Sequence, residues 1–291
     1  MKLKEIEQKR IEIYKKTKTT IIIGIGLIVG SFLLFVIIAA NMAFDRGPLL
    51  IIILLTTFFC GAVIAGIGSN QQKKFKNEIK NKLIDLDDFS EIKNLTYDAN
   101  KHIEEKTIEE VKILQNPDRV RGEDLVTGTY KDIYFEVSDI KLSDRDSDGN
   151  EHTYFEGVWY TFKLPQNFNS TIKVMKMHNF SRKIFKVETE MYEFNKRFKQ
   201  YTDNQNLYFK IMKPIFIEKI IELEDKYKSK ISFAYINDYF YLAMEDRKEF
   251  LKVDLSNEIN EKTIKNFKED IREILQFIDE FYYNQNGILI D

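Results

Sequence analysis

The chain has 291 residues, a formal net charge of −2 and a single cysteine, Cys60. One cysteine excludes an intramolecular disulfide and any CxxC metal or redox site, in agreement with a reducing compartment. No nucleophile elbow, phosphate-binding loop or dinucleotide-binding glycine motif occurs, so the sequence indicates no cofactor and no particular enzyme class.

Two uncharged stretches, residues 19–44 and 47–72, follow the N-terminal segment. An apolar helix of about 20 residues spans the hydrocarbon of a bilayer, and only a helix satisfies its own backbone there. The sequence therefore predicts a two-helix transmembrane hairpin over residues 19–72. A cleaved signal peptide is the alternative for the first stretch, but the run is too long and has no small-residue cleavage pattern before Asp45.

Basic residues flank the predicted hairpin on one side. The tail 1–18 and the segment 73–82 are rich in Lys and Arg, whereas the turn between the spans contains only Arg46. Cytoplasmic flanks collect such residues. We therefore expect a cell-membrane protein with two spans and both termini in the cytoplasm, with the basic segments near anionic lipid headgroups.

Small residues recur four positions apart in the spans, at Gly26 and Gly30, Ala39 and Ala43, and Gly61 and Ala65. This spacing permits close approach of membrane helices. Packing of the hairpin on itself is the favoured interpretation, and oligomerisation is the alternative. Because neither span contains a charged residue, an ion or proton pathway has no residues to use, and the hairpin is interpreted as an anchor.

The remainder of the chain is acidic, with a net charge of −10 over residues 83–291. Phosphate binding needs a clustered basic surface, so we expect no nucleic-acid partner. From residue 69 the apolar spacing is helical, and a second helix is predicted over residues 104–115, before Pro117. Residues 73–116 are therefore expected to form a juxtamembrane helical stalk.

Residues 117–291 are expected to form a cytoplasmic α+β domain with a mainly antiparallel sheet and flanking helices. Alternating runs over 125–142 and 153–164, separated by the turn-rich segment 143–150, predict a β-hairpin. The later elements are two strands at 171–177 and 183–188, a helix at 190–198, a strand at 207–212, a helix at 214–226, a hairpin of 231–236 and 239–243, and a long amphipathic helix at 261–284.

The segment Asp144–Gly149 resembles the first half of a calcium-binding loop. Asp144, Asp146 and Asp148 alternate and a glycine follows at the sixth position. The twelfth position, which should supply a bidentate glutamate, is Phe155. An acidic hairpin loop is the favoured interpretation, and a cation site is the alternative.

Two adjacent carboxylates, Glu123 and Asp124, are the acid–base candidates, although such a pair in a turn is more often solvated or capping. The three histidines are scattered without metal-ligand spacing, at His102, His152 and His178. The sequence therefore predicts no metal centre. Trp159 is expected in the domain core.

Residues 122–130 are Gly-Glu-Asp-Leu-Val-Thr-Gly-Thr-Tyr. This stretch fits one hallmark of a bacterial family catalogued as domain of unknown function 3137, which the sequence resembles. A second hallmark matches at Tyr201, Gln205 and Pro214, but Asn204 replaces its acidic residue. The resemblance covers roughly residues 70–255 and implies a two-pass membrane protein with a cytoplasmic α+β domain. It implies no activity.

Three functions remain open on the sequence. The first is a membrane-anchored cytoplasmic binding or scaffold module. The second is a membrane-face enzyme that uses Glu123 and Asp124, and the third is an accessory subunit of a larger membrane complex. The expected partners are the lipid bilayer and either another protein or a second copy of the chain.

Overall fold

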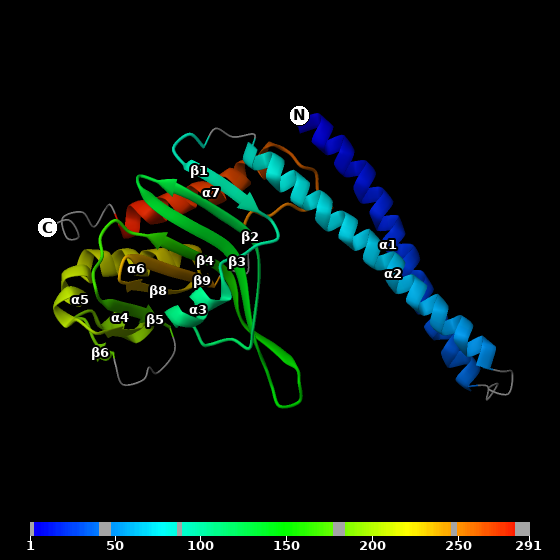
Figure 1. Cartoon of the computed structure of the whole chain (residues 1–291), viewed down its shortest axis with the longest axis horizontal. Coiled ribbons are helices and arrows are strands. Elements are labelled where there is room, and N and C mark those ends of the chain that lie inside the picture. Colours follow the sequence, from blue (N-terminus) through cyan, green and yellow to red (C-terminus); the bar gives the residue numbers. More distant parts are fainter. Residues whose placement is uncertain (1–2, 41–47, 86–88, 177–183, 246–248, 283–291) are drawn as a thin grey trace. The chain divides into compact units, whose positions relative to one another are not determined.

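The protein is described by a computed structural model that covers residues 3–40, 48–85, 89–176, 184–245 and 249–282 (Figure 1). The chain forms two compact units. Unit 1 comprises Met1–Leu83 and Val253–Lys265, and unit 2 comprises Ile84–Lys252 and Asn266–Asp291. After Lys252 the chain therefore passes from unit 2 to unit 1, and at Asn266 it continues in unit 2.

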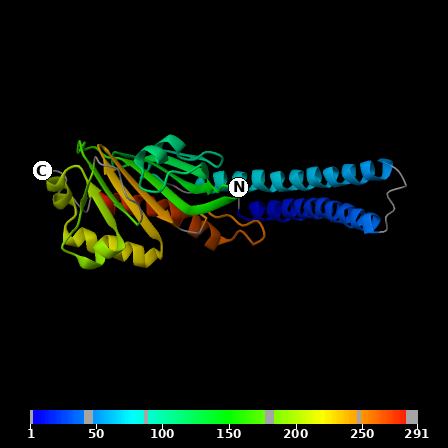
Figure 2. The same cartoon turned by 90° about the horizontal axis from the view of Figure 1, so that it is seen from below.

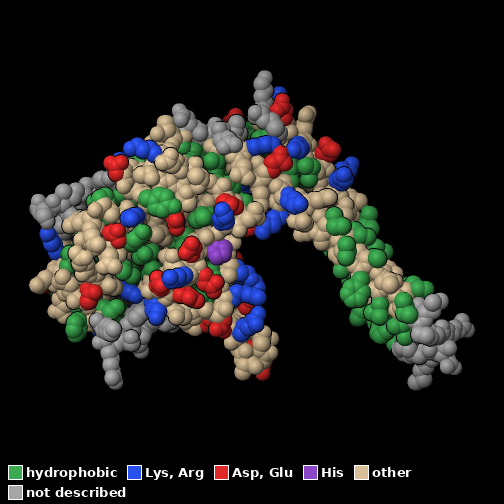
Figure 3. All heavy atoms as spheres, viewed as in Figure 1, with side chains coloured by type: hydrophobic (Ala, Val, Ile, Leu, Met, Phe, Trp, Pro, Cys, Tyr) green, Lys and Arg blue, Asp and Glu red, His purple; other side chains and the backbone are tan. Residues whose placement is uncertain are grey.

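Unit 1 is built on two long helices, α1 (Leu3–Ala40) and α2 (Pro48–Asp85), which Figure 2 shows side by side. Both are long and apolar enough to cross a membrane. Large apolar side chains such as Ile22, Phe32 and Phe59 are exposed along them, and Figure 3 shows apolar side chains among neutral atoms on the lower part of the hairpin. A surface of this kind matches lipid hydrocarbon. The prediction of two apolar helices is confirmed.

The two helices approach each other through glycines. A Cβ on Gly24 would lie 2.6 Å from the carbonyl oxygen of Gly61, and a Cβ on Gly61 would lie 2.7 Å from the carbonyl oxygen of Gly24. Packing of the hairpin on itself is thus confirmed at Gly61. It is wrong for Gly26 and Gly30, where an added Cβ would meet no heavy atom within 4 Å. Residues four positions apart lie on one face of a helix, but this spacing does not show which neighbour that face packs against. Ala43 lies outside the described residues.

The N-terminal segment is a continuation of α1. Its Lys9 forms an ion pair with Glu78 of α2 at 2.8 Å, and Gln72 donates to the hydroxyl of Thr17 at 3.0 Å. Apolar side chains of both helices are buried over the same stretch, at Ile6, Phe75, Ile79 and Leu83. The basic residues predicted for a tail thus lie on a paired helical stem.

Residues 253–260, here called the strap, complete this stem within unit 1. Arg10 donates from Nη1 to the carbonyl oxygen of Leu255 at 2.6 Å, and the backbone N–H of Ile259 donates to Glu7 at 3.0 Å. Arg10 and Glu7 also form a two-pronged pair at 2.7 and 2.8 Å. The apolar side chains of the strap, Val253, Leu255 and Ile259, are buried.

Unit 2 contains a nine-stranded sheet in the order β1-β2-β3-β4-β9-β8-β5-β7-β6, with antiparallel pairing throughout. The strands are β1 (Lys93–Asp98), β2 (Arg119–Tyr130), β3 (Ile133–Arg145), β4 (Glu151–Lys163), β5 (Thr171–Met175), β6 (Phe185–Val187), β7 (Lys199–Thr202), β8 (Lys230–Ile236) and β9 (Tyr239–Glu245). The helices are α3 (Glu105–Val111), α4 (Tyr192–Arg197), α5 (Gln205–Ile211), α6 (Pro214–Tyr227) and α7 (Glu261–Phe281), of which α7 begins in unit 1. The predicted α+β class with an antiparallel sheet and flanking helices is confirmed.

Both faces of the sheet are covered. Aromatic side chains of β4, β8 and β9 pack against α6 and α7, as in the contacts of Tyr160 with Phe277 and of Phe216 with Phe233. On the opposite face, Trp159 packs in a cluster with Ile108 and Val111 of α3. Strand alternation sends neighbouring residues to opposite faces, and the predicted core position of Trp159 is confirmed.

Two element predictions are wrong. The run 125–142 is not one strand, because Lys131 and Asp132 adopt positive φ values and turn β2 back into β3. The segment 207–212 is helical rather than extended. The side chain of Asn204 accepts from the backbone N–H of Leu207 at 3.1 Å and caps α5, and a cap of this kind stabilises the start of a helix by about 1 kcal/mol.

The first two elements of unit 2 fall in the predicted stalk. Strand β1 pairs with β2, and α3 packs in the Trp159 cluster. Residues 93–111 thus contribute to the sheet domain, whereas the helical prediction from residue 69 holds to Asp85.

Lys173 on β5 provides a pH test of the fold. Its Nζ donates to the carbonyl oxygen of Val111 at the end of α3, and burial lowers its pKa to about 8. A lysine in an unfolded chain has a pKa of about 10.4. Between pH 8 and 10 the unfolded chain therefore binds more protons, and the stability of the folded state rises with pH.

We expect the free energy of unfolding of the full-length protein in detergent to rise by roughly 2 kcal/mol from this group between pH 8 and 10. The Lys173→Met variant should lack that increment, because methionine does not titrate. Chemical denaturation at pH 8, 9 and 10 measures the difference. Parallel pH dependences in the two proteins would refute the assignment.

Candidate functional site

The candidate acids Glu123 and Asp124 lie at a bulge of β2. The register with β3 shifts after Glu123, and Asp124 has a φ of 62° and is buried. Its carboxylate accepts from the hydroxyl of Tyr97 on β1 at 2.5 Å, and burial together with this carboxylate raises the pKa of Tyr97. Asp124 thus fastens β1 to β2. Neither acid lines the hollows described below.

The glycines of the predicted hallmark 122–130 are packing residues. A Cβ on Gly122 would lie 2.5 Å from the carbonyl oxygen of Asp139 and 2.6 Å from the Cβ of His102. A Cβ on Gly128 would lie 2.6 Å from Ile92. Together with the bulge at Asp124, these contacts give the hallmark a structural role in joining β1, β2 and β3.

The three aspartates of the acidic loop do not converge. Asp146 accepts from the backbone N–H groups of Asp148 and Asn150 at 3.0 and 2.8 Å and from the imidazole of His152 at 2.9 Å. Asp144 instead receives the side chain of Gln115. Among the described residues, no three His, Cys, Asp or Glu side chains form a group that could hold a metal ion. The geometry is that of a closed hairpin turn.

The loop yields a titration prediction. Hydrogen bonds from His152 and Asn150 lower the pKa of Asp146 to about 2, against about 3.9 for an unperturbed aspartate. The ionised Asp146 carboxylate therefore stabilises the folded state above about pH 4, and this contribution is lost as the pH falls toward 2. We expect His152→Ala to raise the titration midpoint of the Asp146 carboxyl carbon, measured by NMR. Asp148→Asn should leave it unchanged, since only the backbone of Asp148 contacts Asp146; equal shifts in both variants would contradict the assignment.

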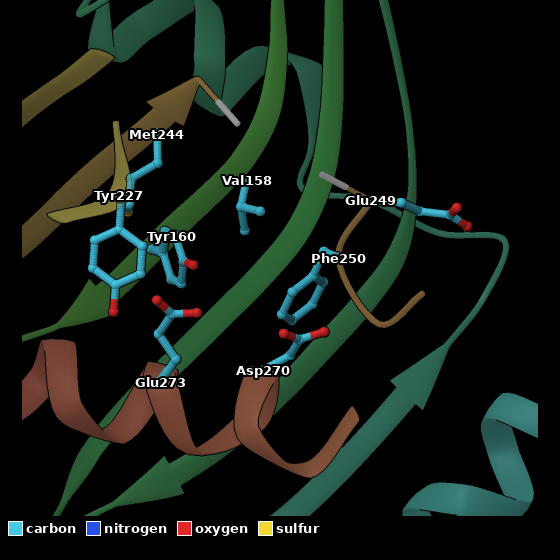
Figure 4. A pocket seen from close by; sticks show the side chains of 8 residues that line it. All are labelled: Val158, Tyr160, Tyr227, Met244, Glu249, Phe250, Asp270 and Glu273. Carbon is cyan, nitrogen blue, oxygen red and sulfur yellow. The ribbon is translucent and has the colours of Figure 1, made fainter. Parts of the chain in front are cut away.

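A small cavity lies between the sheet and α7 (Figure 4). Its volume is about 30 Å³. It is lined by Val158, Tyr160, Tyr227, Met244, Glu249, Phe250, Asp270 and Glu273. This volume accommodates about one water molecule, so the cavity does not admit an organic substrate in this conformation.

The polar groups of the cavity come from β4, from the end of α6 and from α7. Figure 4 shows the carboxylate of Glu273 near the hydroxyl groups of Tyr160 and Tyr227, and that of Asp270 near the ring of Phe250. Burial raises the pKa of Tyr160 well above its ordinary value, and Glu273 and Asp270 add to the rise. Burial and a hydrogen bond to Glu273 raise the pKa of Tyr227. Both phenols therefore stay protonated at neutral pH and serve as hydrogen-bond donors to carboxylates or water.

The chain segment before the strap is tied to the rim of this cavity. The backbone N–H of Leu251 donates to Asp270 at 3.0 Å, and that of Phe250 donates to Asp139 at 3.0 Å. Sequence reasoning did not single out these acids, since Asp270 and Glu273 occur on a helix with many charged residues. Their i, i+3 spacing on one face was the available signal.

Two larger hollows are surface features. One, of about 340 Å³, lies in unit 1 between the start of α1 and the strap, and is lined by Leu3, Lys4, Glu7, Gln8 and residues 258–261. The other, of about 320 Å³, lies at the end of α6 and is lined by Lys176, Glu224, Asp225 and residues 228–230. Charges of both signs line each of them, and Lys176 and Glu224 are paired across the second. Neither hollow selects a ligand of one charge.

A comparison with protein families found one match, which covers parts of both units. Residues 153–282 match the model of a family described as Protein of unknown function (DUF3137). The match covers less than half of the chain. The resemblance inferred from the sequence is confirmed, and the two apolar helices agree with a two-pass membrane protein.

The DUF3137 match runs from β4 to the end of α7 and includes the second hallmark at Tyr201, Gln205 and Pro214. The first hallmark, residues 122–130, precedes it. Within the DUF3137 segment, Asn204 stands where the hallmark has an acid and caps α5 through its side-chain oxygen, which is a role that aspartate also performs.

Two further comparisons were made, with solved structures and with curated proteins. The chain is similar to the crystal structure of the mycobacterial trehalose monomycolate transport factor A, TtfA. The sequence identity is 8%, the TM-score is 0.40, and the match covers 71% of this chain and 94% of that chain. A similarity at this level supports no conclusion about function. A comparison with curated proteins found no match.

Proposed function

We propose that the protein is a membrane-anchored binding module that presents its α+β domain to a protein partner at the cytoplasmic face. The observation that carries the proposal is the construction of unit 1. The helices are in backbone contact at Gly24 and Gly61, and the stem beyond the apolar region is closed by the strap through Arg10 and Glu7. A hairpin that only retained a domain at the bilayer would not need this closure.

The test is in-cell crosslinking followed by mild-detergent purification and mass spectrometry. We expect a stoichiometric protein partner crosslinked to lysines of unit 2. Recovery of the chain without any partner, under conditions that preserve the hairpin, would overturn the proposal.

The cytoplasmic placement of both termini is part of the proposal. It is supported by the basic residues that gather on the stem, such as Lys9, Arg10 and Lys82, because cytoplasmic flanks collect Lys and Arg. A reporter that is active only in the cytoplasm, fused in turn to each terminus and to the turn between the spans, tests it. We expect activity at the two termini and none at the turn; the reverse pattern would invert the topology.

A second candidate is an accessory subunit that binds other membrane helices. Gly26 and Gly30 favour it, because an added Cβ at either position meets no heavy atom within 4 Å of the hairpin, and their spacing suits close helix packing. Loss of the partner on Gly26→Leu, with the hairpin intact, would support this candidate over a partner bound by unit 2. No observed geometry favours the enzyme hypothesis for Glu123 and Asp124.

A further inference from the structure

Helix α3 covers only part of one face of the sheet in unit 2. It packs over Trp159 of β4, on the side of the sheet opposite to α6 (Figure 2). Because side chains alternate along a strand, every second residue after Trp159 extends the same face. Three tyrosines of β3 and β9 lie on this extension and stay accessible: Tyr134 is 40% exposed, and Tyr239 and Tyr241 are half-buried.

Paired residues of β3, β4 and β9 form two neighbouring rows on this face. Directly opposed residues point to the same side of a sheet, so the strand register shows which side chains lie together. The two rows, here called the tyrosine face, are Tyr134, Lys163 and Tyr239, followed by Glu136, Thr161 and Tyr241. The next row contains Trp159 and lies in the cluster with α3.

Contacts within the tyrosine face hold its rings in place. The rings of Tyr239 and Tyr241 are stacked, with their centroids 5.8 Å apart, and the hydroxyl of Tyr134 donates to the carboxylate of Glu136 at 2.8 Å. The Nζ atom of Lys163 lies 5.8 Å from the centroid of the Tyr239 ring. This last contact is a cation–π interaction, so one ring of the face already receives a cation.

Carboxylates surround the ring of Tyr241. Burial raises the pKa of Tyr241 to about 12, and the neighbouring Tyr239 phenol adds to the rise. Three carboxylates raise this pKa further, those of Asp238, Glu110 and Glu136. Asp238 and Glu136 form no ion pair with the residues that the structure describes. A ring beside carboxylates that lack a cationic partner attracts a positive charge.

The space between Glu136 and Tyr241 has a small residue at its floor. Thr161 of β4 separates them, and neighbouring strands lie about 4.8 Å apart, so β3 and β9 are roughly 10 Å apart here. The buried hydroxyl oxygen of Thr161 has no hydrogen-bond partner among the described residues. Since buried polar groups are usually hydrogen-bonded, this row combines an unsatisfied acceptor with a carboxylate and an aromatic ring.

We propose that the tyrosine face binds an arginine side chain of the protein partner, a proposal that rests on the protein-binding function proposed above. A planar guanidinium stacks on tyrosine rings and forms paired hydrogen bonds with a carboxylate such as that of Glu136. None of the three hollows described above is lined by residues of this face. Small molecules prefer concave sites, so the open face favours a side chain that is carried on a protein surface.

The test uses the full-length protein in detergent, with a photo-crosslinker at the rim of the tyrosine face. Thr129 lies directly opposite Tyr134 on β2, and we replace it by p-benzoyl-phenylalanine. The probe is a biotinylated Gly-Ser-Arg-Gly-Ser peptide, and the matched probe carries citrulline, which has nearly the same shape but no charge. We expect about tenfold more crosslinked product with the arginine peptide, because a charged hydrogen bond to a carboxylate is lost with citrulline. Equal yields overturn the proposal.

Removal of one carboxylate charge at two different sites provides the control. Glu136→Gln keeps the shape of the side chain and the acceptor for the Tyr134 hydroxyl, and it should reduce the arginine yield to the citrulline level. Glu190→Gln, which changes an exposed acid outside the tyrosine face, should leave the yield unchanged. Circular dichroism verifies that both variants fold. An equal loss in the two variants, or no loss in Glu136→Gln, overturns the proposal.

The same crosslinker in cells separates this proposal from the proposed function. We expect it to capture a partner segment that contains an arginine, and we expect Glu136→Gln to abolish the capture. If a lysine-reactive reagent joins a partner to unit 2 but the crosslinker at Thr129 captures none, the binding function stands and the arginine site is refuted. Capture of a second copy of the chain also refutes it, whereas the absence of any partner with both reagents overturns the proposed function itself.

Discussion

Gly24→Leu is expected to open the membrane hairpin. Its Cβ would lie 2.6 Å from both the backbone nitrogen of Ala65 and the carbonyl oxygen of Gly61. Backbone atoms of two packed helices cannot move away from this Cβ as the end of a flexible side chain could. Overpacking typically costs 1–3 kcal/mol when side chains can adjust, so we expect a loss of at least about 3 kcal/mol here. Titration with sodium dodecyl sulfate in mixed micelles, followed by circular dichroism, measures it.

Gly26→Leu is the matched control for this experiment. It introduces the same side chain two residues away on the same helix, at a position where an added Cβ meets nothing within 4 Å. We expect the stability of this variant to remain within about 0.5 kcal/mol of the wild type. Similar losses in the two variants would mean that the helices do not pack through Gly24.

Arg10→Met is expected to release the strap. Arg10 is 8% exposed, and its substitution removes the donors to Leu255 and Glu7. Loss of one partner of a largely buried pair leaves a carboxylate and a carbonyl without their charged donor, so we expect a cost of roughly 2–4 kcal/mol. Limited proteolysis of the detergent-solubilised protein should then cut within residues 253–260, and denaturation should give the free energy.

A substitution of Lys9 separates the effect of losing a buried side chain from the effect of losing a positive charge. Lys9 also pairs across unit 1, but its side chain and that of Glu78 are 43 and 41% exposed, and exposed pairs contribute about 0.2–1 kcal/mol. Lys9→Met should therefore leave the strap protected. In addition, Glu7→Leu should also expose the strap, because it removes the acceptor of the Ile259 backbone N–H. Strap cleavage that is equally fast in Lys9→Met would refute the specific role of Arg10.

The elements with strong local signals were predictable from the sequence. The uncharged stretches predicted the two helices of the membrane hairpin. The turn-rich segment 143–150 predicted the hairpin of β3 and β4, and the strands predicted at 231–236 and 239–243 form the hairpin of β8 and β9. The failures are at places where a short polar contact overrides the apolar pattern. Asn204 caps a helix through one side-chain bond, and Lys131 and Asp132 turn the chain without glycine or proline.

The candidate sites were harder to predict, because they depend on contacts between distant residues. Arg10 was one of several basic residues in a segment that resembled a flanking tail, and no local pattern ties it to Leu255, 245 positions away. Asp124 was recognised as a candidate acid, but the partner that defines its role, Tyr97, lies on a strand that the sequence did not predict. The tyrosine face depends on the pairing of β4 with β9, which joins two hairpins that the sequence predicted only separately.

The strap has a consequence for biosynthesis. A chain is made from its N-terminus, so both helices of the hairpin leave the ribosome and reach the membrane long before residues 253–260 exist. Until then, Glu7 and Arg10 lack their backbone partners on the strap. The stem can close only after most of the sheet domain has been translated, which makes it a late, high-contact-order step. A nascent chain that stops short of residue 253 therefore displays an open stem, and a membrane-bound protease could recognise incomplete copies by that feature alone.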